Sequence, residues 1–429
     1  MRTRCLFCFA LVLTLGLAAC SWRGATPPVG QNVAGASLTQ PDAAPKGYKL
    51  IYSFPGGAGG SNPDAGPTFV NGVGFGTTGK GGDVGCNCGT VFAGTKVIYD
   101  FKGASSKDGA TPVGVLLPVG DKLYGVTGAG GRDDSVCAAR SGPAGCGTVY
   151  EIDAGGNERV IYRFKGGRDG KTPGGGLVYR KGVLYGVTFS GGTNAVCYSS
   201  SIPPGCGVVF AIDSSGHEKV IYRFKGGSDG EFPNTQLLSL NGKLYGTTVN
   251  GGEGQPSSCY AGCGTIFSVT PAGKKSLIYA FKGGKDGIAP YSPLLAVNGF
   301  MYGTTAEGGC LSACGQNSGA GTLFKMSPSG SETVVHRFVF AQGSGYSPSG
   351  PLVFLNGKIF GTTGTAESYA GTIYSATLKD FKYLYYFKVT SGDAQDPAGL
   401  TLKPSTQELY GVGHVGGANG VGAIFRYSL

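Results

Sequence analysis

Short runs of β-branched and aromatic residues alternate with clusters of Gly, Pro, Asn and Asp along most of the chain. One set of four runs covers residues 237–240, 243–248, 265–269 and 277–281. Runs of this length and composition predict β-strands. Asn241-Gly242 separates the first two runs and is a strong β-hairpin signal, because both positions accept a positive φ. No window shows a sustained helical period, so the pattern predicts antiparallel strands and no helix.

The second run of each set has a common centre, an aromatic residue followed by glycine. These glycines are Gly76, Gly125, Gly186, Gly246, Gly303, Gly361 and Gly411. Neighbouring copies lie 49 to 61 residues apart (125 − 76 and 186 − 125 are the extremes). Such a period is typical of a solenoid, a propeller or an array. Because a closed ring leaves only short sheet edges open, we predict an all-β fold, a seven-bladed β-propeller of four-stranded antiparallel blades over residues 48–429.

The two ends of this region are out of phase with the four-strand set. Tyr52-Ser53-Phe54 aligns with the fourth-strand residues Tyr222-Arg223-Phe224, whereas residues 424–427 match a third strand. We therefore expect residues 50–54 to pair with residues 423–427, so that the N-terminal strand closes the last blade. The blades are expected to start near Pro67, Pro112, Pro173, Pro233, Pro290, Pro348 and Pro397.

The first residues have the pattern of a targeting segment. Arg2 and Arg4 precede an apolar stretch, residues 5–17, that is too short for a membrane-spanning helix. Leu17-Ala18-Ala19-Cys20 resembles a bacterial lipobox, which implies a signal peptide over residues 1–19 and a lipid on Cys20. An ordinary signal peptide is the alternative. Residues 20–47 are rich in Pro, Gly, Ala and Ser and predict a flexible tether. Ser and not Asp follows Cys20, and by resemblance to Gram-negative lipoproteins this implies an exported protein at the outer membrane or cell surface.

Ten of the 13 cysteines remain after the leader and Cys20 are set aside. They form five local pairs in equivalent loops between second and third strands: Cys86/Cys88, Cys137/Cys146, Cys197/Cys206, Cys259/Cys263 and Cys310/Cys314. In an exported protein such pairs predict disulfides that staple long loops. Zinc is the alternative, but each pair supplies only two of the four ligands of a structural site. Cys86 and Cys88 have one residue between them, a spacing that strains a bridge.

Three copies, residues 146–191, 206–252 and 263–309, are nearly intact versions of one longer unit. The unit contains Gly-Cys-Gly-Thr-Val-Phe, Val-Ile-Tyr-x-Phe-Lys-Gly-Gly-x-Asp-Gly-x-x-Pro and Leu-Tyr-Gly-Thr-Thr. It resembles the GloVer (Gloeobacter/Verrucomicrobia) tandem repeat over about residues 48–429. The resemblance implies an exported bacterial protein with a surface anchor, and it carries no catalytic residue over. Pro55 and Val339 depart from the lysine of the unit, and the double glycine Gly251-Gly252 is also similar to Kelch propellers.

The loop Lys-Gly-Gly-x-Asp-Gly places charged residues at repeated positions. These are Lys102, Asp108, Lys165, Asp169, Lys225, Asp229, Lys282 and Asp286, and Lys388 fills the lysine position of a further copy. The aspartates predict turns, with ligand binding as the alternative. One carboxylate in each loop makes a poor Ca²⁺ site unless backbone carbonyls complete it. With a formal charge of +10, the lysines suit either a solvated face or an anionic glycan, and no basic run dense enough for nucleic acid is present.

Alternating strand direction places the cysteine loops and the Lys-Gly-Gly loops on one face, where binding residues tend to concentrate. Aromatic residues expected in those loops are Tyr198, Phe232, Tyr260, Tyr291 and Tyr346. They would either stack on sugar rings or pack within the loops.

Catalytic motifs are scarce. His217 is expected in a hairpin, His336 in a position that holds tyrosine in other copies, and His414 in the last inter-strand loop. These positions are not equivalent, which argues against a metal ring or a His-based triad. We therefore predict no catalytic residue, metal or cofactor, and expect a monomeric, lipid-anchored module that binds a glycan or an envelope protein. The alternatives are a secreted polysaccharide hydrolase or lyase with loop aspartates as acid and base, and a structural envelope protein.

Overall fold

The computed structural model describes residues 47–82, 85–138, 143–192, 197, 205–252, 259, 261–309, 319–340, 345–364, 370–390 and 392–429. The predicted signal peptide (1–19), nearly all of the tether (20–47), Cys20, Cys310, Cys314, Tyr198 and Tyr260 lie outside these residues. Among the described residues, no helix is both long and apolar enough to cross a membrane.

The described chain consists of strands, with short 3-10 turns at Gly57–Gly59, Ala104–Ser106, Gly167–Asp169 and Gly227–Asp229. The strands form antiparallel units, each named here by its strands. The β2–β6 unit contains β2 (Ser61–Pro63), β3 (Thr68–Val70), β4 (Val73–Lys80), β5 (Thr90–Ala93) and β6 (Lys96–Asp100). The β7–β10 unit contains β7 (Gly109–Val119), β8 (Lys122–Gly130), β9 (Thr148–Asp153) and β10 (Glu158–Arg163). The β11–β14 unit contains β11 (Lys171–Arg180), β12 (Val183–Ser190), β13 (Val208–Ile212) and β14 (Glu218–Arg223).

The later units repeat this order. The β15–β19 unit contains β15 (Glu231–Pro233), β16 (Leu238–Leu240), β17 (Lys243–Asn250), β18 (Thr265–Val269) and β19 (Lys275–Ala280). The β20–β25 unit contains β20 (Gly287–Ile288), β21 (Leu295–Val297), β22 (Phe300–Thr305), β23 (Glu307–Gly308), β24 (Thr322–Met326) and β25 (Glu332–Arg337). The β26–β29 unit contains β26 (Tyr346–Leu355), β27 (Lys358–Gly364), β28 (Thr372–Ala376) and β29 (Phe381–Tyr386). The closing unit contains β30 (Ala394–Lys403), β31 (Glu408–Gly416), β32 (Ala423–Tyr427) and β1 (Tyr48–Ser53).

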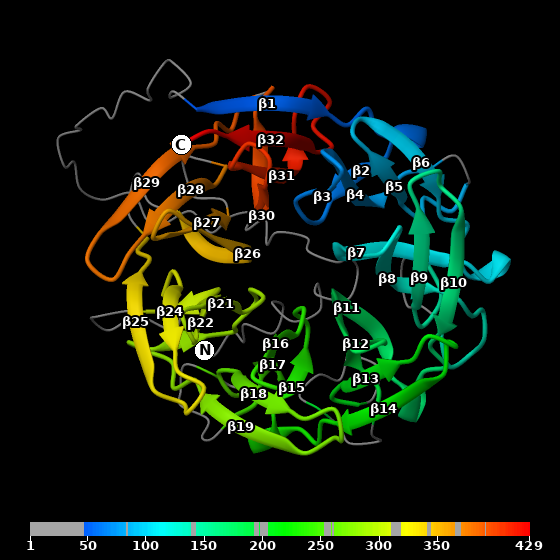
Figure 1. The fold of residues 1–429 in the computed structure, drawn as a ribbon, viewed down its shortest axis with the longest axis horizontal. Helices are drawn as coiled ribbons and strands as arrows, with labels where there is room; N and C mark the ends of the chain where they lie inside the picture. The colour runs from blue at the N-terminus through cyan, green and yellow to red at the C-terminus, as the bar shows by residue number, and fades with distance from the viewer. Residues whose placement is uncertain are drawn as a thin grey trace, which may run out of the picture.

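The units lie around a ring, with the first strand of each nearest to the centre and the last at the rim, so the protein has an all-β, propeller-like fold (Figure 1). β1 pairs with β32 from Tyr48 opposite Tyr427 to Ser53 opposite Ala423. This is the pairing predicted from the phase of the repeat, and it joins the two ends of the described chain in one sheet.

The start of the β2–β6 unit differs from the prediction. The proline equivalent to Pro112 and Pro173 is Pro63 in β2, and not Pro67, because Pro63 makes the same contact with the preceding unit. There Gly422 lies so close to Pro63 that a methyl group on its Cα would overlap the proline ring, and Gly147 lies against Pro173 in the same way. Each glycine takes a positive φ, 121° and 96°, so conformation and close approach both favour glycine at the junction between units.

The hairpin signals have the expected backbone conformation. Asn71, Asn241, Asn298 and Asn356 have φ values of 48–51°, and each following glycine has a φ of 77–81°. Positive φ at both central residues matches the right-handed twist of the paired strands. The Asn-Gly turns therefore fix which strands become neighbours within a unit.

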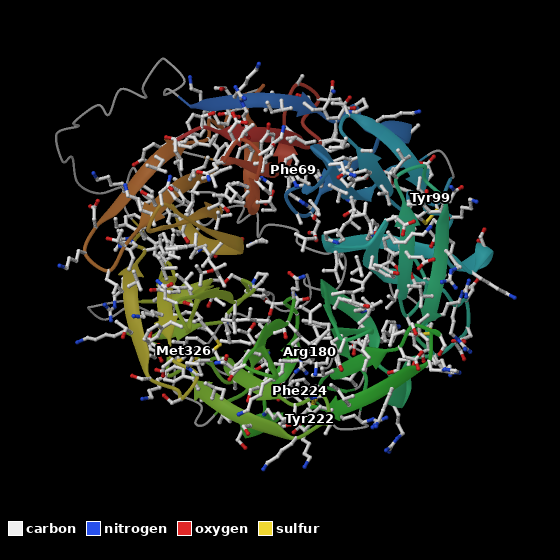
Figure 2. The ribbon with its side chains drawn as sticks, viewed as in Figure 1. Phe69, Tyr99, Arg180, Tyr222, Phe224 and Met326 are labelled. Carbon is white, nitrogen blue, oxygen red and sulfur yellow. A yellow bond between two sulfur atoms is a disulfide. The ribbon has the colours of Figure 1, made fainter. Side chains whose placement is uncertain are left out.

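Aromatic rings join each unit to the next. The phenylalanine just after the last strand of one unit packs edge-on against the third-strand aromatic residue of the following unit, with centroids 4.9–5.3 Å apart. These pairs are Phe54–Phe92, Phe101–Tyr150, Phe164–Phe210, Phe224–Phe267, Phe281–Phe324, Phe338–Tyr374 and Phe387–Phe425. Figure 2 labels Phe224 together with Tyr222, which leads into it from β14.

The repeated glycine of the second strand has a packing reason. A Cβ at Gly246 would stand 2.7 Å from Phe267, and one at Gly303 would stand 2.6 Å from Phe324. The third-strand ring therefore occupies the space that a side chain at the motif glycine would need. This contact explains why an aromatic–glycine pair marks every copy of the repeat.

Candidate functional site

The aspartates of the Lys-Gly-Gly loops hold each loop closed on the last strand of its unit. The carboxylate of Asp169 accepts hydrogen bonds from the backbone N–H of Lys165 (2.7 Å) and the hydroxyl of Tyr162 (2.8 Å). Asp108, Asp229 and Asp286 accept the equivalent pair of bonds. Asp393 does so in a further copy, where alanine and not glycine follows the aspartate, so the Asp-Gly pattern did not reveal it in the sequence. These are the contacts of the turn alternative, although Oδ1 of Asp286 accepts no hydrogen bond from the described residues.

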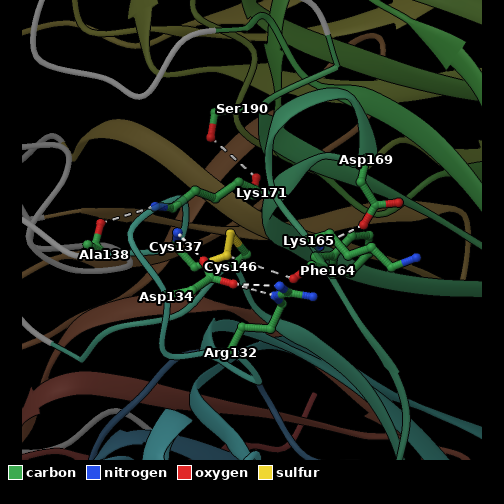
Figure 3. The surroundings of a disulfide bond; sticks show 10 residues. All are labelled: Arg132, Asp134, Cys137, Ala138, Cys146, Phe164, Lys165, Asp169, Lys171 and Ser190. Carbon is green, nitrogen blue, oxygen red and sulfur yellow. Dashed lines mark hydrogen bonds and ion pairs between the residues drawn. A yellow bond between two sulfur atoms is a disulfide. The ribbon is translucent and has the colours of Figure 1, made fainter.

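Disulfides lie directly beside these loops. The structure joins Cys86 to Cys88, Cys137 to Cys146, Cys197 to Cys206 and Cys259 to Cys263. A Cβ at Gly166 would stand 2.9 Å from the Sγ of Cys146, so the bridge packs against the Lys-Gly-Gly loop. Figure 3 shows this bridge beside Lys165 and Asp169. The two kinds of loop therefore meet on one face of the ring and support each other.

Residues around this disulfide also fix the cysteine loop. Arg132 forms an ion pair with Asp134 at 2.6 Å, and an Asp134 oxygen accepts the backbone N–H of Cys137. Lys171 reaches the carbonyl of Ala138 with its ammonium group, while its own carbonyl accepts a bond from Ser190 (Figure 3). Burial lowers the pKa of Lys171. The described part of this loop is thus held by a covalent bond, an ion pair and hydrogen bonds together.

The lysines of the same loops remain available. Lys102, Lys165, Lys225 and Lys282 are exposed, and Lys388 is half-buried. The ammonium groups of Lys102, Lys165 and Lys282 lie 5.8–6.0 Å from the ring of the tyrosine that binds the loop aspartate. Within the described residues, these three lysines form no ion pair. These exposed lysines therefore bring positive charge to this face.

Three of the loop aspartates each lie near a glutamate of the following unit. Burial, followed by the charge of Asp108, raises the pKa of Glu158 to about 7. Glu218 stands beside Asp169 and Glu332 beside Asp286, and the same two causes raise their pKa to about 8 and about 7. In the β15–β19 unit Lys275 takes this place and pairs with Asp229 at 2.7 Å. The first residue of the outermost strand (β10, β14, β19 or β25) thus lies beside the Tyr–Asp pair of the preceding unit.

Of the aromatic side chains expected on the loop face, those that the structure describes are half-buried or buried. Phe232 lies in β15, is 2% exposed and stacks on Phe189 at 4.8 Å, so it belongs to the core and not to a binding loop. Tyr346 begins β26, and both it and Tyr291 are half-buried. The interpretation of Phe232 as a loop residue was wrong because the first strand begins earlier than its proline suggests.

The three histidines have different environments. His217 lies in the hairpin before β14. His336 stacks on Phe381 at 3.4 Å, and burial lowers its pKa to about 4, as expected for a packed side chain. His414 lies in β31 and not in a loop.

His414 meets two aspartates that the sequence analysis did not single out. β30 pairs with β31 so that Gln395 faces Val415 and Pro397 faces Gly413, which places Asp396 opposite His414. The imidazole Nδ1 lies 3.2 Å from the carbonyl oxygen of Pro63, and Asp64 follows directly. Burial raises the pKa of both Asp64 and Asp396, while the backbone N–H of Gly114 lowers the pKa of Asp64 and a charge on His414 lowers both by less than burial raises them. We call Asp64, Asp396 and His414 the junction cluster.

The junction cluster could have been found by comparing the copies position by position. The counterparts of His414 are Gly79, Gly128, Phe189, Val249, Ala306 and Gly364. The counterparts of Asp396, just before the junction proline, are Asn62, Thr111, Thr172, Phe232, Ala289 and Ser347. The counterparts of Asp64, just after that proline, are Val113, Gly174, Asn234, Tyr291, Ser349 and Ala398. All of these counterparts are uncharged at neutral pH. Asp396 precedes Pro397, which packs on Gly371 of the β26–β29 unit, whereas His414 faces Pro63 of the β2–β6 unit. No group of three or more potential metal ligands is present in the described part of the chain.

Residues 23–254 and 135–364 each match the Gloeobacter/Verrucomicrobia repeat, and the chain belongs to this family. No curated protein matches it in sequence.

The chain is similar to several solved structures. A prolyl endopeptidase has 14% identity and a TM-score of 0.45, over 82% of this chain and 46% of that one. A putative glucose dehydrogenase from Thermus thermophilus has 14% identity and a TM-score of 0.40, over 74% and 96% of the two chains. A gluconolactonase from Xanthomonas campestris has 14% identity and a TM-score of 0.36, over 71% and 81%. We draw no argument about activity from these likenesses.

Proposed function

We propose that the protein is an exported, lipid-anchored, seven-bladed β-propeller that binds a glycan or an envelope protein without catalysis. Each four-stranded unit would be one blade, and β1 would supply the outer strand of the last blade. The repeated Gly–Pro junctions and the repeated aromatic pairs between units support this count, since both recur from β1 to β32.

Export and anchoring are proposed from the leader and the cysteines. The lipobox-like residues before Cys20 favour a lipid anchor, which with the following tether would hold the ring near a membrane surface. Disulfides are typical of proteins in oxidising compartments, which supports export. Mass spectrometry of the mature N-terminus should find an acylated Cys20, and an unmodified N-terminus at another residue would contradict the anchor.

The observation that carries the binding proposal is the construction of the loop face. Disulfides pack against the Lys-Gly-Gly loops, and each loop aspartate is bonded to the backbone and to a tyrosine. A face held in this way loses little conformational entropy when it binds a partner. Its exposed cations, Lys102, Lys165, Lys225 and Lys282, suit carboxylate, sulfate or phosphate groups of the partner.

A glycan array probed with the full chain tests this proposal. We expect binding to acidic glycans that weakens with salt and with the combined substitution of Lys165→Gln and Lys225→Gln. Lys358→Gln, at an exposed residue that begins β27, is the matched control and should bind as the wild type does. Binding that is unaffected by the paired substitution would refute a role for the lysines, and depolymerisation of any array glycan would refute the non-catalytic proposal.

A further inference from the structure

Arginines at the ends of three outermost strands bind the Lys-Gly-Gly loop of the preceding unit. In each case the Nε–H group donates to the carbonyl oxygen of the residue just before the loop aspartate. These bonds join Arg163 to Lys107 (2.7 Å), Arg223 to Arg168 (3.1 Å) and Arg337 to Lys285 (3.0 Å). The residue that accepts each bond is itself cationic. Two positively charged residues therefore meet at each of these junctions between units, and we call the three junctions the arginine contacts.

The units also join where the sequence lacks an arginine contact. In the loop after β14 the residue before Asp229 is Ser228, and the last residue of β19 is Ala280. The two units still pack through Phe224 and Phe267, whose rings lie 5.0 Å apart. The arginine and the cationic loop residue are thus present together at three junctions and absent together at this one. Like charges held close together are unfavourable, so the arrangement suits an anion that binds both.

The charges of the arginine contacts are accessible. The exposed members are Lys107, Arg163, Arg168 and Lys285, and the half-buried members are Arg223 and Arg337. None of the six takes part in an ion pair between described residues. The loop carbonyl takes only the Nε–H of each arginine, so the terminal amino groups of the guanidinium can donate two parallel bonds to one oxyanion. Each contact therefore fixes the guanidinium group and leaves it donors for a ligand.

A glutamate near each arginine does not cancel the charge of that arginine in mild acid. Glu158, Glu218 and Glu332 begin the strands that end in these arginines. Burial, followed by the charge of the loop aspartate, raises the pKa of Glu218 to about 8 and the pKa of the other two to about 7, while the arginine acts in the opposite direction. At about pH 6 these carboxyl groups are mostly protonated, so they carry little charge to offset the arginines.

We propose that the arginine contacts bind a sulfated polysaccharide along the rim of the loop face. This inference rests on the proposed function, which gives the loop face an acidic partner, and it names the anionic group and the residues that recognise it. A sulfate ester has three terminal oxygens, so two can accept the guanidinium fork and the third can accept the neighbouring cationic side chain. A carboxylate has only two oxygens in all. Since the contacts lie at three junctions, one polymer chain can engage several of them, and its affinity rises with its length.

Binding of the full chain to immobilised dextran sulfate at pH 6 tests the proposal, with carboxymethyl dextran of equal length and charge as the comparison. The sulfated polymer should bind at least roughly tenfold more tightly. A sulfated disaccharide should bind at least roughly tenfold more weakly than the polymer at equal sulfate concentration. Equal affinity for the two polymers, or for the polymer and the disaccharide, would overturn the proposal.

Two paired substitutions connect the binding to the arginine contacts. Arg163→Gln with Arg223→Gln should weaken dextran sulfate binding at least roughly tenfold. Arg180→Gln with Lys181→Gln is the matched control, because it removes the same charge at the turn between β11 and β12, on the opposite face, and it should bind as the wild type does. An equal loss in both pairs would show attraction by net charge alone and would contradict the proposal.

A gain of binding guards against a result caused by misfolding. Ser228→Lys with Ala280→Arg installs the missing contact and should bind dextran sulfate at least roughly threefold more tightly, and an unchanged affinity in the folded variant would count against the proposal. If substitution of Lys165 and Lys225 weakens binding to an acidic glycan but the arginine pair does not, this inference fails alone. An absence of binding to every acidic polymer would remove the proposed function as well.

Discussion

Glu158→Gln should make the protein more stable at alkaline pH and leave it nearly unchanged in mild acid. Glu158 begins β10 and meets Asp108 of the preceding unit, with Tyr99 hydrogen-bonded to that aspartate at 2.9 Å. Burial and the charge of Asp108 raise its pKa to about 7, while Tyr99, Arg163 and Lys102 act in the opposite direction. Because the folded pKa is higher than the usual pKa of 4.5, the favourable contribution of Glu158 is complete below about pH 4.5 and is lost as the pH rises through about 7.

The magnitude follows from this shift. The pKa rises from 4.5 to about 7, and each unit corresponds to about 1.4 kcal/mol, so a fully buried group would lose about 3.5 kcal/mol at alkaline pH. Glu158 is only partly buried, and solvent screening reduces this to about 1–2 kcal/mol. Glutamine keeps the shape but carries no charge, so the variant should gain about that much near pH 8.5 and little near pH 5.

Urea unfolding followed by circular dichroism at both pH values measures the effect. Glu307→Gln, at an exposed residue of β23, is the control, and its stability relative to the wild type should be the same at both pH values. If the wild type becomes more stable between pH 5 and pH 8.5, or if Glu158→Gln shows the same difference at both values, the reasoning about this carboxyl pair is refuted.

Three further predictions concern the contacts that build the ring. Gly147→Ala should destabilise the fold by about 3 kcal/mol or more, because a methyl group there overlaps Pro173 at a φ of 96°; unchanged urea unfolding would contradict the junction contact. Asp169→Asn should cost about 1–3 kcal/mol through its two lost charge-assisted bonds and should increase proteolytic cleavage near its loop. Phe224→Ala should cost about 3–5 kcal/mol, measured by the same unfolding, since this fully buried ring packs on Phe267 of the next unit.

Local chemistry determined much of the fold. The Asn-Gly turns needed only positive φ at two adjacent positions, and the structure has it at Asn241 and Gly242. The phase of the repeat determined that β1 would pair with β32, since a fourth strand was missing at one end of the chain and present at the other. The loop aspartates were interpreted as turn residues for the same local reason, and their bonds to the backbone agree with this.

The tertiary structure alone decided which ionisable groups meet. Glu158 and Asp108 belong to different copies of the repeat, and their contact depends on how one unit packs on the next. Asp64 is separated from His414 by most of the chain, and only closure of the ring places the imidazole beside Pro63, the residue before Asp64. A repeat pattern predicts the features that all copies share, namely their backbone conformation and the periodic burial of their strands. Charge interactions depend on distance in space, so the contacts between ionisable groups of different copies became visible only in the tertiary structure.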